Sequence, residues 1–147
     1  MCIRDRYIPI HFTAEELVPE AVFRDRGDQS LELIDERVLM TLDQLRDAFG
    51  TCIVNDWSWG GPYSESGLRN PECDVYSATS QHTFGRAMDC KFDHVYAEDV
   101  RKHVIAHKDT FPYIRFIEDE VDWFHFDVRN CEPIQLWSPS SNTVRQV

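Results

Sequence analysis

The chain has 147 residues, a formal net charge of −11, 42% hydrophobic residues and 12% aromatic residues. This length and composition fit one globular domain rather than two. No run approaches the roughly 18 consecutive apolar residues of a membrane span, and no charged and apolar leader precedes a cleavage site, so we expect neither membrane insertion nor export. A pI near 4.8 without any run of lysine or arginine argues against nucleic acid as a partner.

Residues 1–6 resemble sequencing adapter read through as coding sequence, and we therefore place the domain at residues 7–147. The five cysteines are odd in number and include no C-x-x-C pair. A chain of this size can form a core without disulfides, so we expect free thiols.

The first third of the chain predicts mainly helices. Residues 7–12 alternate and are rich in β-formers, which predicts a strand. Thr13 and Glu16 form a capping-box pair that opens a short helix, and Pro19 interrupts or restarts it. The apolar residues that follow recur at helical spacing up to Gly50 and predict an amphipathic core helix: Ile34, Val38, Leu42, Leu45 and Phe49.

The remainder of the chain predicts mainly strands. Residues 51–55 favour a short strand, and the polar segment 56–80, 25 residues long, is typical of a functional loop. A helix is expected over residues 97–107. Further strands are expected over residues 86–92, 113–118, 123–128 and 134–137, the last at the edge of the sheet. This order predicts an α+β fold with a small antiparallel sheet packed against helices.

A histidine and an aspartate flank a predicted glycine turn. His82 precedes Gly85 and Asp89 follows it, seven residues after the histidine. Glycine lets the chain reverse tightly, so both side chains are expected to point at one spot. From spacing alone they are either metal ligands or a hydrogen-bonded pair in a loop.

A second histidine lies in the predicted strand 123–128. Alternation places His125 and Asp127 on one face together with Trp123, and the apolar residues between them on the other. Two imidazoles and one carboxylate form a three-ligand set, which leaves a tetrahedral zinc ion one open position for water. Nitrogen ligands favour zinc over calcium or magnesium.

Two motifs carry a resemblance to a known family: Ser80-x-His82-x-x-Gly85-x-Ala87-x-Asp89 and Asp122-x-x-His125-x-Asp127. They resemble the zinc peptidases that include D-Ala-D-Ala carboxypeptidases, D-Ala-D-Ala dipeptidases and phage L-alanyl-D-glutamate endopeptidases, which share the hedgehog/DD-peptidase zinc-binding fold. An aspartate at the first position of the second motif resembles the phage endolysin branch.

The resemblance implies roles for five residues. It implies that His82, Asp89 and His125 bind one zinc ion per chain and that Asp122 is the catalytic general base. The segment 66–69 resembles a Ser-Gly-Tyr-Arg element, with leucine in place of the aromatic residue. The resemblance of this segment implies that its last residue, Arg69, holds the substrate or the oxyanion of the reaction.

Other residues keep alternatives open. In a regular strand a residue three positions before His125 faces the opposite side, so Asp122 needs a bend to reach the metal. Glu120 and Asp127 are therefore alternative bases, of which Asp127 shares the strand face of His125. The acidic run 118–120 otherwise favours a solvated turn.

The remaining histidines and the tryptophans of the long loop are weaker candidates. His103 and His107 lack the intervening glutamate of a zincin motif, and with His94 they are expected at the surface. Trp57 and Trp59 either cover the core or form a wall of the substrate groove.

The sequence therefore predicts a zinc metallopeptidase whose partner is the peptidoglycan stem peptide. The expected type is a phage endolysin of L-alanyl-D-glutamate specificity, which stays in the host cytoplasm until lysis and then acts on the cell wall. Two alternatives are a D-Ala-D-Ala carboxypeptidase or dipeptidase, and a non-catalytic phage module that binds the cell wall.

Overall fold

A six-stranded sheet organises the described part of the chain, residues 6–131 and 134–147, in the computed structural model. Its strand order is β1-β2-β4-β3-β5-β6, and neighbours are antiparallel except β3 and β5. The strands are β1 (Cys52–Ile53), β2 (Ala87–Phe92), β3 (Phe116–Glu118), β4 (Phe124–Asp127), β5 (Gln135–Ser138) and β6 (Thr143–Gln146). The α+β prediction is confirmed, but β5 is not the edge strand, because β6 pairs with its outer side.

Three α-helices accompany the sheet within the same described residues: α1 (Glu20–Arg26), α2 (Glu36–Phe49) and α3 (Ala97–Ala106). Four short 3-10 helices occupy Ala14–Glu16, Gly27–Leu33, Trp57–Trp59 and Lys108–Thr110. The predicted capping box is present, since the Glu16 carboxylate accepts a hydrogen bond from the Thr13 backbone N–H at 2.7 Å. None of the described helices has the length and apolar composition to cross a bilayer.

The predicted strand over residues 7–12 is wrong. This segment pairs with no strand in the described part of the chain, because acidic side chains of α2 take its backbone donors: Glu36 accepts from Tyr7 N, and Asp43 accepts from the N–H groups of Ile10 and His11. Residues 1–5, which include Cys2 of the predicted non-native leader, lie outside the described residues. The other four cysteines form no disulfide, as expected.

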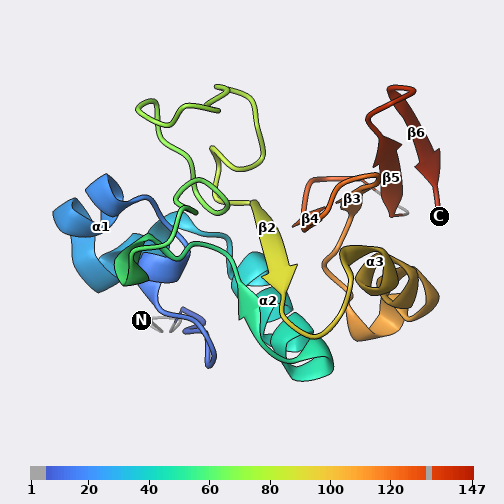
Figure 1. Cartoon of the computed structure of the whole chain (residues 1–147), viewed down its shortest axis with the longest axis horizontal. Coiled ribbons are helices and arrows are strands. Elements are labelled where there is room, and N and C mark those ends of the chain that lie inside the picture. The colour runs from blue at the N-terminus through green and yellow to red at the C-terminus, as the bar shows by residue number, and fades with distance from the viewer. Residues whose placement is uncertain (1–5, 132–133) are drawn as a thin grey trace, which may run out of the picture.

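The two faces of the sheet differ in what covers them. Figure 1 shows α2 and α3 on one side of the strands and the long segment between β1 and β2 on the other. Apolar strand residues on the helix side join the buried core with the apolar stripes of α2 and α3: Met88, Cys90, Ile117, Phe124, Phe126 and Leu136. Strand alternation therefore points the intervening side chains, including Asp89 and His125, toward the long loop.

Candidate metal centre

The pairing of β2 with β4 brings two of the predicted ligands together. Asp89 and His125 are directly opposite one another in the antiparallel register, so their side chains leave the same face of the sheet. Asp89 Oδ1 lies 2.8 Å from His125 Nδ1. The contact follows from the register of two strands whose other faces are buried, and slippage of either strand by one residue would turn the ligand side chain of that strand into the core.

The turn before β2 brings the third predicted ligand to the same place. Gly85 has a φ of +69°, and a Cβ there would lie 2.0 Å from the carbonyl oxygen of Leu33, so only glycine fits. His82 Nδ1 lies 2.9 Å from the carbonyl oxygen of Gly67. Because a carbonyl oxygen only accepts, Nδ1 carries the proton and Nε2 faces Asp89 Oδ1, at 3.5 Å.

A carboxylate and a guanidinium fix the orientation of His125. Its Nε2 lies 3.1 Å from Asp127 Oδ2, and Asp127 is fully buried. Arg129 donates from Nε and Nη2 to the two oxygens of Asp127, at 2.7 Å each. Asp127 therefore lies on the opposite edge of the imidazole ring from Asp89, and it holds His125 with Nδ1 toward the other ligands.

These three side chains can hold a metal ion. Within the described ranges they are a group of histidine, cysteine or acidic residues whose ligand atoms all lie within 4.8 Å of one another. Ligands about 2.1 Å from a tetrahedral ion are about 3.4 Å apart. His82 Nε2 and Asp89 Oδ1 are 3.5 Å apart, close to this value, whereas Asp89 Oδ1 and His125 Nδ1 are at the hydrogen-bond distance of 2.8 Å. Three buried acceptors, His82 Nε2, Asp89 Oδ1 and His125 Nδ1, converge on one point, and they repel one another unless a cation or a proton lies between them.

The charges of the three ligands respond to this convergence. Burial lowers the pKa of His82, so its imidazole is neutral. Burial alone raises the pKa of Asp89, but its hydrogen bonds with His125 and His82 outweigh burial and hold that pKa well below its usual range. Burial lowers the pKa of His125, but its hydrogen bonds with Asp127 and Asp89 outweigh this and raise the pKa to about 9. A proton on His125 therefore takes the place of a cation.

Arg69 lies next to the ligands. Its Nη2 is 3.2 Å from Asp89 Oδ2, and its Nε donates to the carbonyl oxygen of Glu65 at 2.6 Å. The backbone N–H of Arg69 donates to the carbonyl oxygen of His82, at 3.2 Å. The segment 66–69 is thus docked on the site, and the guanidinium adjoins a predicted ligand, where it can stabilise a negative oxygen.

The three candidate bases occupy different places. Asp122 is exposed, makes no hydrogen bond within the described residues, and lines a hollow together with Arg69 and Asp89. Asp127 shares the strand face of His125, but His125 and Arg129 take up its carboxylate. Glu120, at a positive φ of 65°, instead accepts from Ser140, away from the ligands.

Sequence reasoning missed Glu118, which it assigned to a solvated turn. This glutamate is half-buried and lines a hollow together with His82 and His125. Burial raises its pKa, with a smaller opposing effect of His125. Alternation from Phe116 along β3 would have placed Glu118 on the face of His125, and this is the signal that the acidic run concealed.

Two hollows meet at the ligands. The β5-side hollow, about 570 Å³, reaches across β4 and β3 to β5, and its wall includes Phe116, Glu118, Arg129, Gln135 and Trp137. The loop-side hollow, about 410 Å³, lies between β2 and the long loop, and its wall includes Pro62, Tyr63, Val75, Lys91 and Asp122. Both hollows share Arg69, Asp89 and Trp123. His82 and His125 line only the β5-side hollow, and Asp89 lies where the two hollows adjoin. The two hollows together are called the groove below.

The other side chains singled out from the sequence lie away from this groove. His94, His103 and His107 are exposed, as expected. Trp57 covers the core, where its indole N–H donates to the carbonyl oxygen of Val18 at 2.9 Å, and Trp59 is 64% exposed. Neither tryptophan lines the two hollows.

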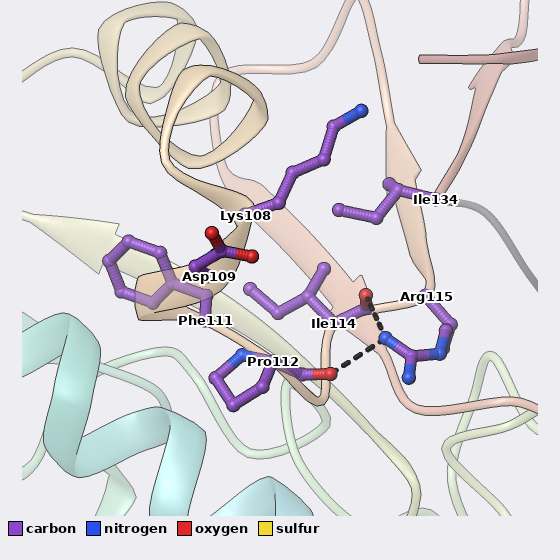
Figure 2. Close-up of a pocket in the computed structure, with 7 residues that line it drawn as sticks. All are labelled: Lys108, Asp109, Phe111, Pro112, Ile114, Arg115 and Ile134. Atoms are coloured by element: carbon purple, nitrogen blue, oxygen red, sulfur yellow. Dashed lines mark hydrogen bonds between the residues drawn. The ribbon is translucent and has the colours of Figure 1, made fainter.

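A separate cavity of about 530 Å³ lies beside the Lys108–Thr110 helix (Figure 2). Its two cations bind backbone carbonyl oxygens: Arg115 those of Pro112 and Ile114, and Lys108 that of Val147. Asp109 is its only carboxylate among the described residues, and no histidine or cysteine lines it there. The described residues of this cavity therefore do not form a metal-binding site.

Comparisons with known proteins found no family model, no curated protein and no solved structure that matches the chain.

Proposed function

We propose that the protein is a zinc-dependent peptidase that cleaves the peptide part of bacterial peptidoglycan. The observation that carries the proposal is the convergence of His82, Asp89 and His125 in a groove that also holds two arginines and two carboxylates, and neither carboxylate forms an ion pair with a described residue. Two imidazoles and one carboxylate suit zinc and leave a coordination position for water. The motifs that resemble the endolysin branch supply the substrate class.

Several residues of this chain would have separate roles in hydrolysis. His82, Asp89 and His125 would hold zinc, which would supply a Lewis acid for the scissile carbonyl and for a water molecule, whose pKa falls to about 7 at such sites. Asp122 takes the proton of the attacking water and delivers it to the departing amine. Arg69 donates to the oxygen that becomes negative, and the Asp127–Arg129 pair keeps His125 in position.

The open groove favours an endopeptidase over a carboxypeptidase. A carboxypeptidase needs a closed end with a cation for the terminal carboxylate, whereas an endopeptidase needs room on both sides of the bond. Arg69 lies where the two hollows meet, rather than at an end. Cleavage of the L-alanyl-D-glutamate bond is therefore our proposal, as in a phage endolysin that reaches the wall at lysis.

Digestion of purified peptidoglycan tests this function. We expect new L-alanyl carboxyl termini and D-glutamyl amino termini by mass spectrometry, and no digestion after chelation of the metal or in His82→Ala. Release of free D-alanine alone would support the carboxypeptidase alternative. Binding to the wall with no new termini in a zinc-loaded protein would support the non-catalytic alternative.

Two carboxylates compete for the role of base. We expect Asp122→Asn to retain the metal and to lower turnover by about 10²–10⁴-fold, because proton transfer contributes that much in other enzymes. The matched variant Glu118→Gln should lower turnover less. The opposite order of the two variants, at equal zinc content, would assign the base to Glu118.

A further inference from the structure

A guanidinium in the β5-side hollow is held rigidly. Arg129 donates from Nε and Nη2 to Asp127, and its Cζ lies 3.5 Å from the ring centroid of Phe116. The ion pair fixes one edge of the planar group, and the aromatic ring fixes its face. Asp127 is fully buried, whereas the side chain of Arg129 is 33% exposed.

The outer edge of this guanidinium has no partner within the described residues. Arginine carries five N–H donors, and Nε and Nη2 of Arg129 serve Asp127. Bidentate pairing places Nη1 on the side away from Asp127, and Nη1 donates no hydrogen bond to any residue that the structure describes. Arg129 lines the β5-side hollow, so this donor edge is available to a ligand there.

The two arginines of the groove differ in position. Arg69 contacts the predicted ligand Asp89 and lines both hollows, as expected for a group at the reacting carbonyl. Arg129 lines only the β5-side hollow, along with Gln135 and Trp137 of β5. A chain bound across the ligands would meet Arg129 only on the β5 side of the bond that is cut.

We propose that the β5-side hollow is a carboxylate subsite in which Arg129 binds a carboxylate of the substrate. The proposal rests on the proposed function and adds a specificity determinant to it. Asp127 shares its charge between Arg129 and His125, so it does not cancel the positive charge of the guanidinium. Glu118 in the same hollow forms no ion pair with the residues that the structure describes, and it therefore disfavours an anion on the β3 side.

Stem peptides offer two carboxylates of this chemistry, the α-carboxylate of D-glutamate and the carboxyl terminus. The probes are L-Ala-γ-D-Glu-L-Lys-D-Ala-D-Ala and two analogues in which one or the other carboxylate is a carboxamide. Binding to metal-free protein is measured by the fluorescence of Trp123 and Trp137, which line the hollow. The kcat/KM of zinc-loaded protein is measured for the same peptides.

We expect one of the two analogues to bind at least about tenfold more weakly than the parent peptide. Arg129→Lys should reduce this ratio to near one, because a single ammonium held by Asp127 cannot present a second donor edge. Arg86→Lys is the matched control, since Arg86 is exposed and also lies against a phenylalanine ring, and it should keep the ratio. Zinc content and thermal unfolding of each variant establish that the site is intact.

Four results would overturn the inference. Equal binding of all three peptides by the wild-type protein removes the subsite, and so does a ratio that persists in Arg129→Lys. If the peptides are cleaved without any preference, the inference fails and the proposed function stands. If the folded protein neither binds nor cleaves them, both fail.

Discussion

His125 lies between two carboxylates, and this placement couples metal binding to a proton. Asp89 faces its Nδ1 and Asp127 faces its Nε2, at 2.8 and 3.1 Å. A metal ion needs the lone pair of Nδ1, so it must displace the proton that Asp89 otherwise favours there. Asp127 favours a second proton on Nε2 of His125, both with and without a metal ion at Nδ1. This hydrogen bond orients the ring in the same way in both cases.

Metal binding should release one proton per ion at pH 7. The pKa of His125 is raised to about 9, so in the metal-free protein the ring is protonated below that pH and gives up one proton on binding. His82 contributes none, because its pKa is lowered. The affinity of the protein for the metal ion should therefore rise with pH up to about 9 and then level off. Calorimetry in two buffers of different ionisation enthalpy counts the protons, and a count of zero at pH 7 would contradict the assignment.

Asp127→Asn should weaken metal binding by about 10–100-fold, because the amide no longer favours a proton on Nε2 and the ring loses its fixed orientation. The measurement is a competition titration with a chromophoric chelator. Asp93→Asn, the same change at an exposed aspartate, is the control and should bind metal as the wild-type protein does. Equal affinities of the two variants would show that Asp127 plays no part in holding the ligand.

At the scale of elements, the segment 66–69 ties the site to the amino-terminal part of the chain. Leu68 N donates to the carbonyl oxygen of Leu17 at 2.9 Å, and Asp89 N donates to that of Ser66 at 2.8 Å. Gly67 lies between these contacts, and a Cβ on it would approach the Leu17 carbonyl oxygen to 2.1 Å. The glycine therefore permits the close backbone approach that places Arg69 beside Asp89.

Gly67→Ala should destabilise the fold by more than about 2 kcal/mol, because two backbone segments must separate to admit the methyl group. Gly60→Ala is the matched control: its φ is +83°, but a Cβ there has nothing within 4 Å, so we expect only the left-handed strain of about 1 kcal/mol. Urea unfolding of both variants gives the comparison. A cost for Gly67→Ala no greater than that of the control would refute the close approach.

Elements with a strong local pattern were predictable, and those set by distant partners were not. The apolar stripe of α2 and its end at Gly50 are local, and the predicted helix is confirmed, although it begins at Glu36 and Ile34 precedes it. Residues 7–12 alternate like a strand but pair with acidic side chains of α2, which no local pattern reveals. The parallel pairing of β3 with β5, and the edge strand β6, equally depend on distant contacts.

In the candidate site, too, residues in local motifs were predictable and residues placed by distant strands were not. Motif spacing and strand alternation brought out His82, Asp89 and His125, which the structure places together. Alternation also placed Asp127 on the face of His125 but not on the far edge of its ring. The positions of Glu118 and of the walls of the groove depend on how β3 and β5 lie beside β4, so sequence reasoning did not assign them.

At the scale of the whole molecule, the three candidate ligands come from separate segments of the chain, which the small sheet alone connects when no ion is bound. His82 belongs to the turn before β2, Asp89 to β2 and His125 to β4, so a bound ion links them across the groove. Because the unfolded chain does not bring these side chains together, an ion that binds the folded state stabilises it.

Zinc at about 100 times its dissociation constant should stabilise the protein by about 2.7 kcal/mol and raise its melting temperature by roughly 5–10 °C. Thermal unfolding with and without zinc measures the shift. His82→Ala should show a much smaller shift under the same conditions, while Ala substitution of the exposed His94 should leave it unchanged. A wild-type shift that persists in His82→Ala would place the ion elsewhere.

The cross-strand pairing of Asp89 with His125 also determines when during folding the site comes into being. The two residues are 36 positions apart, and His82 lies on the turn of Gly85, which packs against the backbone at Leu33. Such non-local contacts carry a large loop-closure cost and form late. An ion would then find its ligands only after the folding barrier has been crossed. Zinc should slow unfolding while leaving the refolding rate almost unchanged, because the metal would stabilise only the chain that has already folded.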